Sequence, residues 1–165
     1  MSSLKRARRG FTLIELLLVI GIIAILASIV IVAINPTRQL AQARDTQRRS
    51  DVNTLINAIY QYSIDEDTLP ACIQDAAIDV PLNICSSGCV GYDPAANLAG
   101  NGGVASCDLT AALEGDYLVG IPVDARAAAT YPGYSGYQVV RDAASRLTVT
   151  ATETEIEDPA ISVQR

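Results

Sequence analysis

The pattern of apolar and polar positions begins with a long apolar stretch near the N-terminus. From Leu16 through Ile34 no side chain is charged, and about twenty such residues are enough to cross a bilayer as a helix. The stretch therefore predicts a membrane-spanning helix. Glu15 stands at its start, where a carboxylate beside hydrocarbon is costly unless a partner or a function offsets that cost.

A second helical pattern follows the apolar stretch. Pro36 removes a backbone donor and predicts a bend or a local gap, and Thr37 to Asp51 is polar with mixed charge, which is typical of a solvated helix face. Five apolar residues then recur at helical spacing and predict a stripe that seats a globular head: Val52, Leu55, Ile56, Ile59 and Tyr60. We expect one helix, kinked at Pro36 and roughly 80 Å long, which ends before Pro70.

Strand patterns appear only near the C-terminus. Leu147 to Thr152 alternates aliphatic residues with threonine, the period-two pattern of a half-buried strand, and Tyr137 to Val140 is the second candidate. The residues between them, 142–145, are expected to form the turn of an antiparallel hairpin. Asp108 is suited to cap a short helical turn at 109–113. The tail, 153–165, shows no pattern and is expected to be frayed or to cover a sheet edge.

A cysteine-bearing loop is expected between the helix and the strands. From Ala71 to Gly103 the sequence loses its periodicity and fills with Pro, Gly, Asn and Cys. Four cysteines lie in or near this loop, on the exported side of the predicted span, where disulfides can form: Cys72, Cys85, Cys89 and Cys107. Two bridges are expected and three connectivities are possible. We favour Cys72 with Cys85 and Cys89 with Cys107. A zinc site is disfavoured because the spacing is irregular and the chain has no histidine, so no metal is predicted.

Composition argues against an enzyme and against nucleic-acid binding. The 165 residues leave room for one modest domain after the span. The chain has a net charge of −6, and beyond Tyr62 acids far outnumber bases, which gives a surface that repels phosphate backbones. Without histidine, and with Lys5 as the single lysine, no catalytic constellation or cofactor is predicted. Four aspartates lack the spacing of a dedicated calcium loop, and calcium binding stays open for them: Asp93, Asp108, Asp116 and Asp124.

A specific motif joins the basic N-terminus to the apolar stretch. The sequence KRARRGFTLIELLLVI, which starts at Lys5, resembles the leader and helix start of type IV pilins and of the pseudopilins of type II secretion. The resemblance implies that a prepilin peptidase cuts between Gly10 and Phe11 and methylates Phe11, and that Glu15 sets the register between subunits. Cleavage would place the α-amino group of Phe11 one turn from Glu15, and a neighbouring copy would present the same amine.

The resemblance implies a structural subunit of a type IV pilus-like filament, polymerised through its N-terminal helix. Its partners would be other copies of the chain, the prepilin peptidase, an assembly ATPase and platform proteins. The precursor would be a single-pass protein of the cytoplasmic membrane, and the mature form would lie in an extracellular filament at the cell surface. In such a filament the arginines of residues 37–51 could meet the acidic heads of neighbours. Two alternatives stay open: a type II secretion pseudopilin, and a monomeric membrane-anchored binding module.

The expected fold class is α+β, with a long N-terminal helix, a small antiparallel sheet and a disulfide-stapled loop. Four parts are expected: a leader at 1–10, a transmembrane or filament-core helix at 11–34, its amphipathic continuation at 35–64 and a globular head at 65–165. An ordinary secretory signal peptide is disfavoured because the apolar run is too long. For Glu15 the alternative is a carboxylate that snorkels to the membrane interface.

Overall fold

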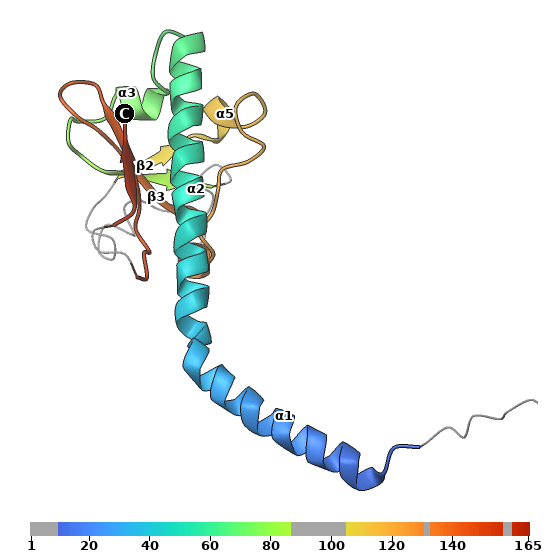
Figure 1. Ribbon diagram of the computed structural model, residues 1–165. Coiled ribbons are helices and arrows are strands. Elements are labelled where there is room, and N and C mark those ends of the chain that lie inside the picture. Colours follow the sequence, from blue (N-terminus) through green and yellow to red (C-terminus); the bar gives the residue numbers. More distant parts are fainter. Residues whose placement is uncertain (1–9, 87–104, 131–132, 157–159) are drawn as a thin grey trace, which may run out of the picture. The chain divides into compact units, whose positions relative to one another are not determined.

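The computed structural model in Figure 1 describes residues 10–86, 105–130, 133–156 and 160–165. Its internal contacts divide the chain into two units, Met1–Leu40 and Ala41–Arg165. The second unit, which we call the head, contains the sheet and most of the second helix.

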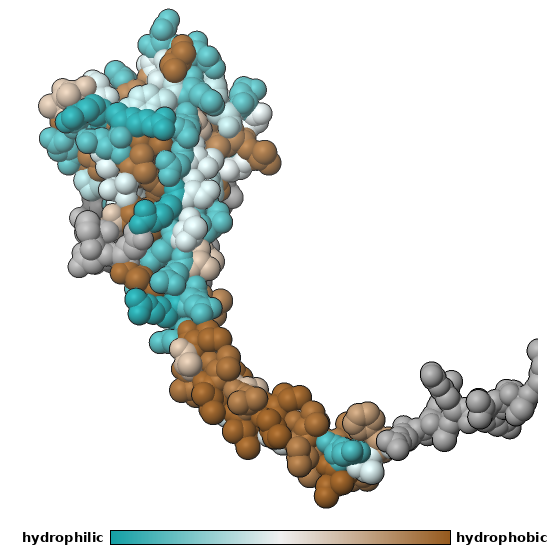
Figure 2. Space-filling model, viewed as in Figure 1, coloured by the Kyte–Doolittle hydropathy of each residue, from teal (hydrophilic) through white to brown (hydrophobic). Residues whose placement is uncertain are grey.

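Helix α1, Leu13–Ile34, is apolar over its whole length and has no buried residue. Thr12 caps its N-terminus, and Glu15 lies in its first turn. Among the described residues it is the one helix long and apolar enough to cross a membrane. Figure 2 shows the apolar side chains of α1 as a nearly continuous brown surface. The predicted membrane-spanning helix is therefore present as a helix with its apolar residues exposed.

The chain leaves helical geometry at Asn35, which has a left-handed φ of 48°. Helix α2, Pro36–Asp65, starts at the next residue. The Asn35 side chain accepts hydrogen bonds from the Thr37 hydroxyl and the Arg38 backbone N–H, and Pro36 occupies the first turn, where its missing N–H costs little. The gap predicted at Pro36 is confirmed, but the prediction of one continuous helix was wrong, because Asn35 ends α1 and its side chain caps α2.

The head contains a five-stranded sheet in the order β2-β1-β3-β4-β5. Strand β3, Tyr134–Arg141, pairs antiparallel with β4, Leu147–Ala151, so the predicted hairpin is confirmed. Strand β5, Ser162–Gln164, adds antiparallel to β4. Strand β1, Leu82–Cys85, pairs antiparallel with β3 and parallel with β2, Ala105–Asp108. The sheet is therefore mostly antiparallel, and the α+β fold class is confirmed.

The apolar stripe of α2 packs on one face of this sheet (Figure 1). Val52, Leu55, Ile56 and Ile59 are all fully buried, as the helical spacing predicts, and Tyr60 packs at the edge of the same core. The opposing surface comes from alternate residues of the central strands: Tyr137, Val139, Leu147, Val149 and Ala151. The apolar stripe therefore holds the sheet against α2.

The described part of the head also contains three short helices: α3, Ala71–Gln74; α5, Thr110–Leu113; and α6, Ala125–Thr130. Helix α5 confirms the predicted helical turn, although it starts one residue later than expected. Asp108 does not occupy the cap position. Its carboxylate instead accepts the Thr110 backbone N–H at 2.9 Å.

A disulfide joins Cys72 in α3 to Cys107 in β2, with the Cα atoms 5.3 Å apart. The predicted pairing of Cys72 with Cys85 and of Cys89 with Cys107 was therefore wrong. Cys107 pairs in register with Ile84 and faces the core beneath α2. Cys85, one residue further, points to the opposite face and packs with Tyr134, because successive strand residues alternate between faces. Cys85 is also disulfide-bonded, and Cys89 lies outside the described residues.

Candidate functional site

The first candidate site is the start of α1. Gly10 and Phe11 are exposed, and a side chain added at Gly10 would meet no atom within 4 Å. Phe11 keeps 81% of its surface exposed. The peptide bond between these residues therefore lies in an open segment, immediately before the helix begins at Leu13.

Thr12 and Glu15 form a reciprocal cap at this helix start. The Glu15 backbone N–H donates to the Thr12 hydroxyl at 3.3 Å. In return Oε2 of Glu15 accepts the Thr12 backbone N–H at 2.9 Å and the Thr12 hydroxyl at 2.7 Å. This is a capping box, in which each side chain satisfies a backbone donor of the first turn. The carboxylate is thereby folded back toward the N-terminal end of α1.

Glu15 was expected to need a cation, and its partners within the chain, the Thr12 backbone N–H and hydroxyl, were not predicted. The signal was present, since Thr-x-x-Glu before an apolar run is the sequence pattern of a capping box. Within one chain, then, Thr12 contributes to holding the carboxylate of Glu15. The hydrogen bonds from the Thr12 backbone N–H and hydroxyl both end on Oε2 of Glu15. The capping box therefore orients the carboxylate and uses one of its two oxygens.

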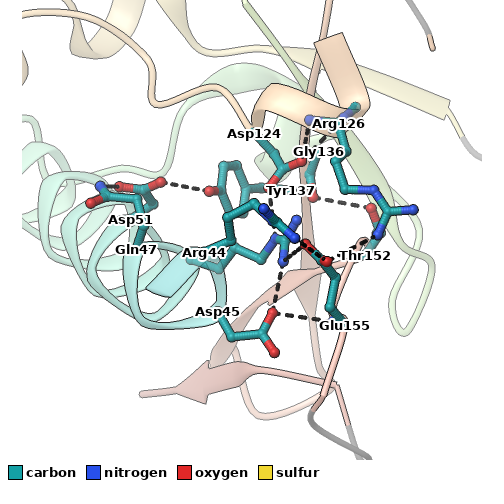
Figure 3. Close-up of polar contacts among 12 residues, drawn as sticks. Arg44, Asp45, Gln47, Asp51, Asp124, Arg126, Gly136, Tyr137, Thr152 and Glu155 are labelled. Carbon is teal, nitrogen blue, oxygen red and sulfur yellow. Dashed lines mark hydrogen bonds and ion pairs between the residues drawn. The ribbon is translucent and has the colours of Figure 1, made fainter. Parts of the chain in front are cut away.

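The second candidate site is a cluster of arginines and carboxylates in the head (Figure 3). Arg48 of α2 is 1% exposed. Its Nε donates to Asp124 Oδ2 at 2.6 Å, and its Nη1 donates to Asp45 Oδ1 at 2.7 Å and to Glu155 Oε1 at 3.2 Å. One guanidinium therefore joins α2, the segment before α6 and the segment after β4.

Glu155 collects further cations at the same place. Arg44 donates to both of its carboxylate oxygens, at 2.5 and 2.6 Å, the bidentate geometry that makes arginine pairs strong. Arg126 of α6 approaches within 3.6 Å. These contacts lower the pKa of Glu155 from 4.5 to about 2, chiefly through the hydrogen bond from Arg44. Glu155 therefore stays ionised at pH values at which an ordinary glutamate would be protonated.

The ionised forms of Asp45 and Arg48 are stabilised as well. Burial alone would raise the pKa of Asp45, but hydrogen bonds from Arg48 and from the backbone N–H groups of Ile156 and Glu155 outweigh it and lower the pKa. Burial likewise opposes the charge of Arg48, yet its carboxylate partners raise its pKa. We call Arg44, Asp45, Arg48, Asp124, Arg126 and Glu155 the arginine cluster.

Two comparisons with known proteins bear on the first site. The family model described as the prokaryotic N-terminal methylation motif matches residues 5–31. The type II secretion system core protein G of Aeromonas hydrophila is 38% identical over 80 residues, which cover 47% of this chain and 54% of that protein. The N-terminal part of the chain is therefore similar to that of pilins and pseudopilins. It spans about half the length of this curated relative, and no solved structure matches it.

The family motif covers α1 and its capping box, whereas the arginine cluster lies beyond residues 5–31. In this pilin-like chain the expectation of a solvated face over Thr37 to Asp51 was wrong at Asp45 and Arg48, which are both buried. The alternative, that these arginines meet acidic neighbours, fails for Arg48, whose acidic partners come from its own head. The sequence did not predict that Asp124 and Glu155 would pair with Arg48.

The same contacts decide the role of Asp124, one of the aspartates left open for calcium. Its Oδ2 accepts from Arg48, and its Oδ1 accepts the backbone N–H groups of Arg126 and Ala127 at 2.8 and 3.1 Å. Both oxygens are therefore committed to the head. Among the described residues no group of three or more Cys, Asp or Glu side chains is placed to hold a metal ion.

Proposed function

We propose that this chain is a structural subunit of a pilin-like filament, assembled through α1. The observation that carries the proposal is α1 itself, whose 22 residues are apolar and exposed over the whole length of the helix. Such a surface is stable in lipid, and packing against the same helix of other copies would keep it from water when the subunit leaves the membrane. A helix of a compact enzyme domain would instead bury one face against its own core.

Processing of the N-terminus forms the second part of the proposal. The open Gly10–Phe11 segment suits cleavage by a prepilin peptidase, which would leave Phe11 as a methylated N-terminus. The leader of 1–10 would stay on the cytoplasmic side, where its basic residues are favoured. The assembly ATPase and platform proteins would then draw subunits from the cytoplasmic membrane into the filament.

Glu15 would pair with the Phe11 amine of an adjacent subunit. The capping box supports this role because it holds the carboxylate toward the N-terminal end of α1, where such an amine would lie. A subunit inserted out of register would leave the carboxylate without its cation in an apolar surrounding, at a cost of several kcal/mol. The pair would therefore select one register.

Of the two filament types, the type II secretion pseudopilus is favoured by the relative from Aeromonas hydrophila, which is a core protein of that secretion system. The extracellular type IV pilus, which the leader motif equally suggests, is the second candidate. A deletion strain separates them: loss of secreted enzymes with unchanged surface fibres indicates the pseudopilus, and the reverse indicates the pilus. A monomeric membrane-anchored module predicts neither loss.

Two substitutions at Glu15 test the assembly role. Glu15→Leu removes both the charge and the capping acceptor, whereas Glu15→Gln keeps an acceptor for Thr12 and removes the charge. We expect both precursors to be cleaved, because Gly10 and Phe11 are unchanged. We expect both to give at least about tenfold fewer filaments, because the Phe11 amine of the adjacent subunit would be left as an unpaired buried charge. Cleavage is read by mass spectrometry of the N-terminus, and assembly by the sheared filament fraction.

The pairing role is wrong if Glu15→Gln forms filaments at the wild-type level, because then the capping box rather than the charge matters. The filament proposal itself is wrong if the purified native chain still begins at Met1, or if cross-linking in cells recovers only monomers.

A further inference from the structure

The segment after β4, residues 152–156, runs from the sheet to α2, and we call it the C-terminal strap. Asp45 of α2 accepts its backbone at two successive positions: the Glu155 N–H donates to Oδ1 at 3.1 Å and the Ile156 N–H to Oδ2 at 2.9 Å. One buried carboxylate therefore holds the strap by its main chain, independently of any side chain in the strap.

The side chain of Glu155 supplies the other attachment. It is bound from two elements, by Arg44 and Arg48 of α2 and by Arg126 of α6. Figure 3 shows Arg44 and Arg126 beside Glu155. At the sheet end, the Thr152 backbone N–H and hydroxyl both donate to the Gly136 carbonyl. The strap is thus fixed at Thr152 and at Glu155.

Few apolar contacts hold the chain beyond the strap. Among the described residues after Ala151, Ile161 is the one buried apolar side chain, and Val163 is partly buried. Strand β5 has three residues and pairs only with β4. A segment with so little buried apolar surface opens locally at low cost once its polar attachments are lost. The other attachments are hydrogen bonds: Asp45 accepts the strap backbone, β4 pairs with 161–165, and the Tyr60 hydroxyl donates to the Arg165 carbonyl. The contacts of Glu155 are the charged side-chain attachment that the strap itself supplies.

We propose that Glu155 is a latch: its contacts with the three arginines hold the strap and β5 against the head, and loss of its charge releases both while the rest of the sheet stays folded. Release would take from Arg44 the carboxylate that binds two of its donors, whereas Arg48 would keep its ion pairs with Asp45 and Asp124.

Acid is the direct way to open the latch. Because the pKa of Glu155 lies below its unfolded value of 4.5, the latch contributes fully above about pH 4.5, and its contribution is lost as the pH falls toward about 2. The groups that face Glu155 are the three arginines, with Asp45 and Asp124 bound to Arg48 beside them. Both aspartates have lowered pKa values, so they oppose opening over the same acid range.

The test is hydrogen exchange of the full-length chain in detergent micelles at pH 7, read by mass spectrometry of peptic peptides. We expect Glu155→Gln to speed exchange in residues 160–165 by about tenfold or more, since hydrogen bonds to charged groups are among the stronger ones. Peptides from β1 and β3 should keep their wild-type rates. The matched control is Asp142→Asn, which removes a carboxylate paired with Arg146 at the hairpin turn and should leave 160–165 unchanged.

The latch is wrong if 160–165 exchanges at the wild-type rate in Glu155→Gln, or if it already exchanges as fast as free peptide in the wild-type chain. Should Glu155→Gln loosen the whole head, Arg44→Gln decides, because Arg44 is half-exposed and lies outside the core. Faster exchange confined to 160–165 in that variant supports the latch. Equal acceleration of β1 and β3 overturns it, because the strap would then open only with the whole head.

Discussion

Gly136 on β3 has no side chain, and this allows the start of α6 to lie close to the strand. Its φ is +91°, and a Cβ built there would lie 2.6 Å from Cβ of Asp124 and 2.8 Å from Cβ of Ala127. The start of α6 can therefore lie against β3 only because residue 136 is glycine. That approach places the Asp124 carboxylate within reach of Arg48, so a backbone position controls the geometry of a buried ion pair.

We predict that Gly136→Ala destabilises the head by at least about 2 kcal/mol, because the change adds a clash with two neighbours to an unfavourable backbone conformation. Gly115→Ala is the matched control: its φ is +102°, but nothing lies within 4 Å of an added Cβ. Urea unfolding of both variants in the same detergent should show the larger loss for Gly136→Ala. Equal losses would mean that strain alone acts and that the close approach is unimportant.

At the scale of elements, α2 carries two different interfaces. Its C-terminal half contributes the apolar stripe to the main core, and its N-terminal half contributes Asp45 and Arg48 to the arginine cluster. Burying a charged cluster is costly, and such a cluster is tolerated where every charge has a partner. Here the partners come from segments far along the chain, so α2 organises the head through both apolar packing and ion pairs.

Arg48→Ala should lower the free energy of unfolding of the head by about 3–5 kcal/mol, because it leaves Asp45, Asp124 and Glu155 close together without their shared cation. Arg38→Ala, on the exposed start of α2, is the control and should have no measurable effect. Denaturant unfolding followed by circular dichroism measures both. A neutral Arg48→Ala would show that the cluster adds no net stability.

Local patterns were enough to predict the elements that present one face to the core. The period of Val52 to Ile59 and the alternation of Leu147 to Ala151 both reflect such one-sided burial. Strand β1 was missed because all four of its residues are buried, which removes the alternation. The cluster was missed for another reason: Arg48 meets Asp124 across 76 positions, and no local pattern specifies a pairing between such distant segments.

At the scale of the whole chain, α1 exposes an apolar surface that needs other molecules around it, whereas the head is stabilised by contacts among its own residues. The first, α1, has no buried residue of its own and needs lipid or other copies. The second, the head, closes its own core, ion pairs and disulfide. In the proposed assembly α1 would exchange lipid for other copies, and a head that closes its own core could stay folded during that step.

The Cys72–Cys107 disulfide is the covalent part of that stability. It ties α3 to β2, an outer strand of the sheet, across a sequence separation of 35, and closing a loop of this size stabilises a fold by about 2–4 kcal/mol. We predict that the double variant Cys72→Ser, Cys107→Ser lowers the free energy of unfolding by that amount. Because β2 pairs only with β1, its exchange should accelerate more than that of β3 and β4.

Peptide mapping without reduction checks the connectivity that this prediction requires. The wild-type digest should contain a peptide pair linked through Cys72 and Cys107, and the pair should be absent from the double variant. A link between Cys72 and Cys85 would contradict the structure, because Cys72 and Cys107 lie on the α2 side of the sheet and Cys85 faces the opposite side. In that case α3 could not sit beside β2, and the parallel β1–β2 pair would lose its covalent support.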